Sequence, residues 1–206
     1  MLNAIARMRM QILATSVLLL VGQTAVAETF VCDDGFCVFG PTDVLDNVLV
    51  EGDGILLLDG TTVTGNIHVK DGGVLAATRI LVLGNVQANQ AFLVDVTNST
   101  IEGNFDVKNT GGEGTLFGLL PSVDLLGSQV GGNVQIKDNA VNFIAIASND
   151  IEGNLQVKDN ETRLFTSIAN NIIDGNLQCK DNSPPPIGGG NVVAGHVDPE
   201  CAYLVL

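Results

Sequence analysis

Apolar and polar residues alternate in short stretches along this chain, and the stretches recur about every 20 residues. In the copy IEGNLQVKDN, residues 151–160, Leu155 and Val157 are apolar, whereas Gln156 and Lys158 are polar. Alternation with a period of two predicts a β-strand with one buried face, and no helical period runs between the copies. The pattern therefore predicts a protein built from short, half-buried strands.

A Gly-Asn pair precedes each of these stretches and marks the repeat. Six copies begin at Gly65, Gly84, Gly103, Gly132, Gly153 and Gly175, and a weaker seventh begins at Gly190. A second alternating stretch often lies between two markers, at 91–96, 141–147 and 163–169. Units of about 20 residues with two or three strands each are typical of a solenoid, in which neighbouring units stack.

These features predict an all-β fold, a single-stranded right-handed parallel β-helix of about seven coils of about 20 residues, with disulfide-closed ends. The right-handed form is favoured because left-handed β-helices need a stricter hexapeptide repeat. We expect residues 28–60 to form an N-terminal cap and the first coil, residues 61–183 the repeats, and residues 184–206 a C-terminal cap.

The alternation assigns each repeated residue to the inside or the outside of the solenoid. The marker glycines are expected where the chain turns into the strand, at positive φ or in close contact with another backbone segment. The asparagines after them, Asn66 to Asn191, are expected to stack in a hydrogen-bonded ladder or to satisfy backbone groups of the turn. The inward positions are Ile67, Val69, Val86, Ala88, Phe105, Val107, Val134, Ile136, Leu155, Val157, Leu177 and Cys179.

The outward polar residues of the last three copies are the candidate binding surface. A repeating face of amides, ammonium groups and carboxylates suits a repeating polymer such as a glycan. The alternative is that these residues only keep an exposed strand soluble and discourage edge pairing. The candidate glycan-binding residues are Gln135, Lys137, Asp138, Gln156, Lys158, Asp159, Gln178, Lys180 and Asp181.

The first 27 residues have the features of a secretory signal peptide. They begin with a basic segment that contains Arg7 and Arg9, continue with a short apolar run, and end in AVA. Cleavage is expected between Ala27 and Glu28. No later stretch reaches the ~18 apolar residues of a membrane span. We therefore expect a mature chain without a transmembrane segment that is secreted, extracellular or at the cell surface, with the periplasm as an alternative.

The charge of the mature chain limits its partners. Loss of the two arginines changes the net charge from −14 to −16, because 23 acidic residues then face 9 − 2 = 7 basic ones. So few bases argue against a nucleic-acid partner. We expect no cofactor; calcium is a weaker expectation for the acid-rich turn at 51–60, because acids in turns are usually only solvated.

The four cysteines lie where covers for the two ends of a solenoid belong. Four cysteines allow three pairings, and in an exported chain they are expected to form disulfides. Cys32–Cys37 with Cys179–Cys201 is preferred, because Cys201 follows the inward Cys179 by 22 residues, about one coil. Adjacent coils place Cα atoms near 5 Å apart, a distance that a disulfide accepts.

The interval between Gly103 and Gly132 contains an insertion, roughly residues 111–127, that is rich in leucine. The favoured interpretation is a longer coil with an additional strand. The alternative is a segment that lies over one flank and forms a pocket, and a ligand groove would then be sought there.

An enzyme is the third interpretation of the chain, because parallel β-helices include pectate lyases and polygalacturonases. Their sites need two or three carboxylates beside a basic residue on one strand face. On the outward face of the strands that follow the markers, Asp106 stands between glutamines. GHV at 195–197 resembles the Gly-His-Gly of polygalacturonases without the aspartate motifs that precede it. No catalytic residue is assigned.

The C-terminal run GNLQCKDNSPPPIGGGNVVAGHVDPEC, with GNLQVKDN and GNVQIKDN upstream, resembles a group of exported, mostly bacterial β-helix repeat proteins that end in a disulfide-bracketed Pro-Gly segment. The resemblance covers about residues 60–201 and implies no catalytic residue. A looser similarity to bactofilins, which are polymer-forming β-helices, holds for 62–107; bactofilins are cytoplasmic, whereas this chain has a signal peptide.

The sequence therefore predicts an exported, non-catalytic β-helix protein with a structural or adhesive role. Its expected partner is a polysaccharide or another surface protein. A glycan-binding module that uses the Gln/Lys/Asp face is the alternative, and a polysaccharide lyase or hydrolase is the third interpretation.

Overall fold

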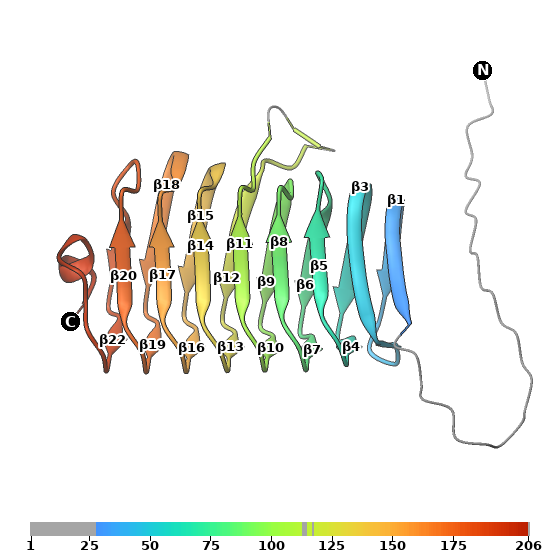
Figure 1. Cartoon of the computed structure of the whole chain (residues 1–206), viewed down its shortest axis with the longest axis horizontal. Coiled ribbons are helices and arrows are strands. Elements are labelled where there is room, and N and C mark those ends of the chain that lie inside the picture. The colour runs from blue at the N-terminus through green and yellow to red at the C-terminus, as the bar shows by residue number, and fades with distance from the viewer. Residues whose placement is uncertain (1–27, 113–114, 117, 206) are drawn as a thin grey trace, which may run out of the picture.

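The computed structural model describes residues 28–112, 115–116 and 118–205 of the chain (Figure 1). These residues wind into a β-solenoid of about eight turns, in which nearly all strand pairs are parallel. The fold is the predicted one. It has one more turn than expected because the first turn, residues 28–46, carries no Gly-Asn marker. The predicted signal peptide lies outside the described residues.

Each turn has three sides, which we call A, B and C. Side A consists of β5 (Ile67–Lys70), β8 (Val86–Asn89), β11 (Phe105–Lys108), β14 (Val134–Lys137), β17 (Leu155–Lys158) and β20 (Leu177–Lys180). Side B consists of β6 (Val74–Thr78), β9 (Leu93–Thr97), β12 (Ser122–Leu126), β15 (Ala140–Ala147), β18 (Glu161–Ala169) and β21 (Ile187–Gly189). Two long strands, β1 (Thr29–Phe39) and β3 (Asn47–Asp59), run through both sides at the N-terminal end.

Side C is an eight-stranded sheet of two-residue strands. They are β2 (Val44–Leu45), β4 (Thr62–Val63), β7 (Leu81–Val82), β10 (Thr100–Ile101), β13 (Gln129–Val130), β16 (Asp150–Ile151), β19 (Ile172–Ile173) and β22 (Val192–Val193). The chain ends in a short 3-10 helix, η1 (Pro199–Leu204).

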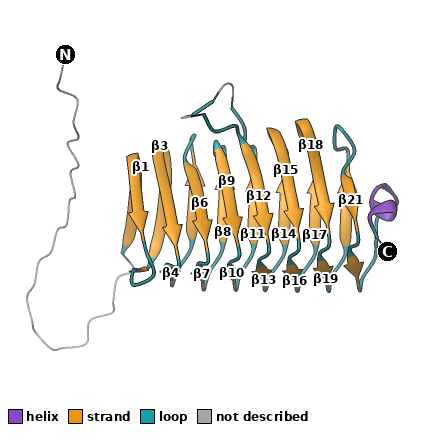
Figure 2. Cartoon of the chain, turned by 180° about the vertical axis from the view of Figure 1, so that it is seen from behind, coloured by secondary structure: helices purple, strands orange, loops and turns teal. Residues whose placement is uncertain are grey.

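The solenoid is right-handed, as predicted. In Figure 1 the N-terminal turns lie on the right, and the side A strands at the front run upward. Figure 2 shows the molecule from behind, where the side B strands run downward. Upward travel at the front and downward travel behind, combined with a leftward advance, trace a right-handed path.

The core is a column of aliphatic side chains inside the three sides. All twelve predicted inward positions are buried, with at most 2% of their surface exposed. Each stacks on its counterpart in the next turn; Val107, for example, is paired in register with Ile136. The core therefore follows from the period-two alternation of the sequence.

The three corners of each turn differ in the backbone conformation and residue types that bend the chain. At the corner between sides A and B, the residue after the strand has a left-handed conformation: Asp71, Gln90, Asn109, Asp138, Asp159 and Asp181, with φ of 52–60°. Asn and Asp tolerate this conformation better than most residues. Between sides B and C the left-handed residues are Gly60, Arg79, Asn98, Gly127, Ser148, Asn170 and Gly190.

The marker glycines form the third corner, between sides C and A. None of the six from Gly65 to Gly175 has a positive φ; they are required by close contact with the preceding turn. The amide of Gly153 donates to the carbonyl of Gly132 at 3.1 Å, and a Cβ added to Gly153 would lie 2.5 Å from that oxygen. Of the two reasons that the sequence offered for these glycines, the close backbone contact is therefore the operative one.

The asparagines after the marker glycines form the predicted ladder. The side-chain oxygen of each one accepts from both the backbone amide and the side-chain amide of the next; for Asn66 and Asn85 both distances are 2.9 Å. The ladder runs through Asn47, Asn66, Asn85, Asn104, Asn133, Asn154 and Asn176, and it ends at the backbone amide of His196.

The assignment of Asn191 to this ladder was wrong. Asn191 belongs to a second, buried ladder after the B–C corner, formed by Asn149, Asn171 and Asn191. The Gly190-Asn191 pair has the same letters as the marker, but Gly190 supplies the left-handed turn of that corner. The structural counterpart of the marker is Gly195, whose amide donates to Gly175.

A third ladder connects the A–B corners through Asn139, Asn160 and Asn182. The amide of Asn160 also donates to the carbonyl of Ile136 at 3.0 Å. Two triplets match the N-glycosylation pattern, Asn98-Ser99-Thr100 and Asn160-Glu161-Thr162. The side-chain amide of Asn160 is buried and hydrogen-bonded, which closes its triplet in the folded chain, whereas Asn98 is exposed.

Both predicted disulfides are present, and each closes one end of the core. Cys32 and Cys37 lie at inward positions of β1 and connect its side A half with its side B half. Phe30 and Phe39 meet edge-to-face beside them, with ring centroids 4.8 Å apart.

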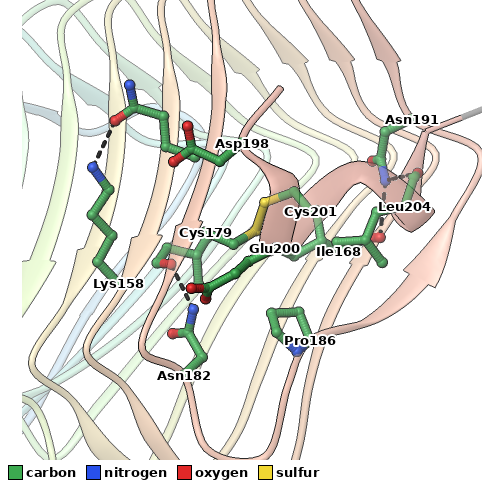
Figure 3. The surroundings of a disulfide bond; sticks show 12 residues. Lys158, Ile168, Cys179, Asn182, Pro186, Asn191, Asp198, Glu200, Cys201 and Leu204 are labelled. Carbon is green, nitrogen blue, oxygen red and sulfur yellow. Dashed lines mark hydrogen bonds between the residues drawn. A yellow bond between two sulfur atoms is a disulfide. The ribbon is translucent and has the colours of Figure 1, made fainter. Parts of the chain in front are cut away.

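At the other end, Cys179 on β20 holds Cys201 of η1 against the core, with Cα atoms 5.5 Å apart (Figure 3). Cys201 and Leu204 are fully buried, and the side-chain amide of Asn191 donates to the carbonyl of Leu204. The helix therefore covers the C-terminal end of the core.

Among the described residues of the insertion, no strand joins the coil besides the regular side B strand β12, so the favoured prediction of an additional strand was wrong. In the described part, Leu116 and Leu119 form an antiparallel bridge in a loop that projects from the A–B corner (Figure 1). Leu116 packs on a small outer cluster formed by Ile55, Val74 and Leu93 of side B. The neighbouring turns fix the perimeter of the coil, so the extra residues leave it and lie over the flank.

Replacing Gly153 with Ala should destabilise the protein, because the added methyl group collides with the carbonyl of Gly132. Overpacking of this kind lowers the free energy of unfolding by about 1–3 kcal/mol. Gly40→Ala is the matched control, since its Cβ meets nothing within 4 Å. Denaturant titrations should separate the two variants, and equal midpoints would contradict the close-contact explanation.

Replacing Asn171 with Ala should cost more than replacing Asn133 with Ala. Loss of Asn171 leaves the buried amides of Asn149 without their acceptor, at about 1–3 kcal/mol for each unpaired group. Asn133 lies in the exposed ladder, where water can replace the lost bonds. Thermal unfolding of both variants measures the difference; a larger loss for Asn133→Ala would refute the role given to the buried ladder.

Candidate functional site

The predicted glycan-binding residues lie together on side A. Gln135, Gln156 and Gln178 are paired in register on β14, β17 and β20. Lys137, Lys158 and Lys180 form the neighbouring row on the same strands. The structure therefore brings together six of the nine predicted residues as two parallel rows of side chains on one flat face.

Many polar groups of this face are bound to one another. The side-chain amide of Gln135 donates to Gln156 at 3.1 Å, and the Lys158 ammonium donates to Gln178 at 2.7 Å. Lys137 and Lys180 each pair with the following aspartate, at 3.3 and 3.6 Å. Such exposed pairs contribute little to stability and separate easily, so the face remains able to exchange its internal contacts for a ligand.

The three aspartates of the prediction have a different role from the rows beside them. Asp138, Asp159 and Asp181 lie in the left-handed A–B corner, where their residue type favours the turn. Their recurrence in the sequence therefore has a structural cause.

A second cluster, on side B, was not predicted from the sequence. Asp95 on β9 and Asp124 on β12 are in-register neighbours on the outer face of adjacent turns. Burial raises the pKa of Asp95, and it raises the pKa of Asp124 to about 6; a hydrogen bond from Ser122 opposes the shift of Asp124, and the nearby charge of Asp95 adds to it. One oxygen of Asp95 is buried without a hydrogen-bond partner.

The sequence does contain a signal for this pair. Equivalent strands on side B have small residues at the position, such as Ala76 and Ala145, whereas two consecutive turns have an aspartate. An acidic residue at the centre of an alternating apolar strand is costly to bury unless it is protonated or paired. The two aspartates stand out against the repeat for this reason.

The surroundings of the pair favour protonation over catalysis. Along the same row, Ala76 and Ala145 flank the two aspartates, followed by Leu57 and Ser167. A sugar-cleaving site combines carboxylates that have separate acid and base roles, usually beside a cation, and this row supplies no cation. Two adjacent half-buried carboxyl groups instead reduce their repulsion when one is protonated.

An open groove of about 420 Å³ lies at the N-terminal end of side B. Val38, Leu57 and Ala76 line it at outward positions of successive turns, and Asp59 and Arg79 form a salt bridge at its rim. The insertion contributes no residue to this groove, although the sequence pointed there.

The acid-rich turn proposed for calcium has other contacts. Glu51 pairs with Lys70 at 2.8 Å, and this partner raises the pKa of the lysine. Within residues 28–112, 115–116 and 118–205, no three His, Cys, Asp or Glu side chains converge as a metal site would require. Calcium binding stays a prediction without a defined set of ligands.

No family model, curated protein or solved structure matches this chain. The similarity to exported repeat proteins therefore stays a prediction from the sequence. In the part of the chain that the structure describes, no helix is long and apolar enough to cross a membrane.

Asp124→Asn should stabilise the protein increasingly as the pH rises. Because the pKa of Asp124 is higher in the folded state, about 6, than in the unfolded chain, about 4, folding is favoured at low pH and loses this contribution as the pH rises through 6. Because solvent screens the charge, the free energy of unfolding of the variant relative to the wild type should rise by no more than about 2 kcal/mol between pH 4 and 7.5.

Urea titrations at both pH values, with exposed Asp150→Asn as the control, measure this gain. A difference between Asp124→Asn and the wild type that stays constant with pH would rule out the raised pKa.

Proposed function

We propose that this protein is an exported, non-catalytic β-solenoid with a structural or adhesive role at the cell surface or outside the cell. The proposal rests on one observation, the structural role of the residues that recur in every copy of the repeat. The glycines and asparagines that recur in every copy hold one turn to the next. The periodicity of the sequence thus serves to build a rigid rod, about 40 Å long for about eight turns of ~4.8 Å.

The ends of the rod support export. Two disulfides fit a protein that folds outside the cytoplasm, because the cytoplasm keeps thiols reduced. They fix the first and last turns, which in a solenoid have a neighbour on only one side. A net charge of −14 favours solubility and separation of the rods.

Glycan binding is the second candidate, and the rows on side A favour it. The ammonium groups of Lys137, Lys158 and Lys180 project from three adjacent strands, with side chains 44–65% exposed where they form ion pairs. Strands in a sheet lie about 4.8 Å apart, so the three ammonium groups form a regularly spaced row. A polysaccharide could therefore lie across the strands and contact every row.

Deletion of the gene in the producing cells tests the structural role. We expect altered attachment or envelope integrity, restored by the wild-type chain recovered from the cell surface or the medium. The matched test is the triple variant Lys137→Gln, Lys158→Gln and Lys180→Gln. Restoration by this variant supports a structural role that does not need the side A lysines.

Binding of the wild type and the triple variant to a glycan array distinguishes the structural function from the glycan-binding function. Retention of the wild type on a glycan, at least tenfold reduced in the triple variant, would establish side A as a binding face. Turnover of uronate polymers by the purified chain, with or without calcium, would overturn the non-catalytic proposal. A deletion strain without any surface defect would overturn the structural one.

A further inference from the structure

We propose that the open edge of β1 at the N-terminal end of the solenoid binds an extended, basic segment of a partner protein as an additional strand. This inference concerns a partner surface and does not depend on the glycan candidate. It is based on the pairing, exposure and charge of the first turn, residues 28–46.

The two ends of the solenoid are closed differently. At the C-terminal end, η1 lies over the core, and Asn191 and Val205 form a bridge there. At the N-terminal end, within the described residues, the strand partner of β1 is β3 alone, and that of β2 is β4. The second edge of β1 therefore presents backbone donors and acceptors at residues 29–35 and 37–39 of the strand.

The first turn also exposes apolar side chains beside this edge. Val31 is 44% exposed, and Val38 and Val44 are each 67% exposed, on sides A, B and C respectively. Val38 also lines the groove of about 420 Å³ on side B. A strand added to β1 would extend sides A and B by one row and would lie beside Val31 and Val38.

The edge is rigid before a partner arrives. Cys32–Cys37 links the two halves of β1, and the Phe30–Phe39 contact fills the end of the core. The pairing of β1 with β3 shifts register between Cys32 and Asp34, which bends the strand at the corner. A preformed edge lowers the entropic cost of binding an extended segment, in which main-chain hydrogen bonds provide affinity.

Charge identifies the partner. Residues 28–46 contain five acids and no Lys, Arg or His: Glu28, Asp33, Asp34, Asp43 and Asp46. A second copy that docked by the same end would bring ten acids together without a counter-charge. Docking of a second copy by its C-terminal end would also be unfavourable, because η1 covers that end and the acids Asp198 and Glu200 lie there. An extended segment that alternates basic and apolar residues complements both the acids and the exposed valines.

A binding experiment with three peptides tests this proposal. The probes are blocked eight-residue peptides that alternate Lys with Val, Glu with Val, and Lys with Gly. The exported chain, with its N-terminus determined by mass spectrometry, should bind the Lys-Val peptide at least tenfold more tightly than the others at low salt. Raising the salt should weaken binding, and hydrogen exchange should slow within residues 29–39.

Paired variants connect binding with the edge. Asp33→Asn with Asp34→Asn should weaken binding at least fivefold, and so should Val31→Gln with Val38→Gln. The controls remove the same groups elsewhere: Asp138→Asn with Asp159→Asn, and Ile172→Gln with Val192→Gln. These controls should bind as the wild type does.

Other occupants give distinct results, each of which overturns the proposal. Equal weakening by the controls, or equal binding of all peptides, would show unspecific attraction. A dimer in sedimentation equilibrium with β1 protected would assign the edge to a second copy. Protection of β1 in a chain that retains residues 1–27, without peptide, would assign it to that segment. Absence of Lys-Val binding would refute a basic partner strand.

Discussion

Every turn of this solenoid must match the perimeter of its neighbours, because each strand is paired in register with the strand above and below it. A single additional residue on one side would reverse the inside and outside of all residues that follow on that strand. The three corners therefore repeat with their own chemistry in every turn. Where the chain has extra residues, between β11 and β12, they leave the stack, and the strands on both sides keep their register.

The same constraint explains why glycine and asparagine recur so regularly in the repeat. A turn narrow enough for the amide of Gly153 to reach the preceding carbonyl has no room for a side chain at that point. Corner backbone groups that turn inward must find partners away from water. The amide of Asn171 provides them, since it bonds both the carbonyl of Ile146 and the next asparagine. Buried polar groups stabilise these corners where they are paired in this way.

The sequence predicts the strands and core of this molecule well, because a period of two assigns a residue such as Val157 to the inside without knowledge of distant contacts. The prediction fails where the same Gly-Asn dipeptide occurs in two different backbone conformations. Gly190-Asn191 reads as a marker, but its glycine is needed for a left-handed φ and its asparagine for a buried ladder. An acid inside an apolar strand marks Asp95 and Asp124 in the sequence, but their pairing could not be derived from it, because the pairing depends on which turns become neighbours across a 29-residue spacing.

Function in a solenoid is then to be sought where the repeat is broken, because residues that recur in every turn are explained by stacking. Side A keeps the repeat in most turns, with Asp106 in place of a glutamine, and many of its polar groups bind one another. Side B departs from it at Asp95 and Asp124, which replace small residues, and the first turn departs from it by lacking the Gly-Asn corner and every basic residue. A two-residue strand such as β2 offers few backbone groups, whereas β1 offers a continuous edge. The chemistry that stacking leaves unexplained therefore lies at two places, the outer flank of side B in the middle turns and the N-terminal end of the solenoid.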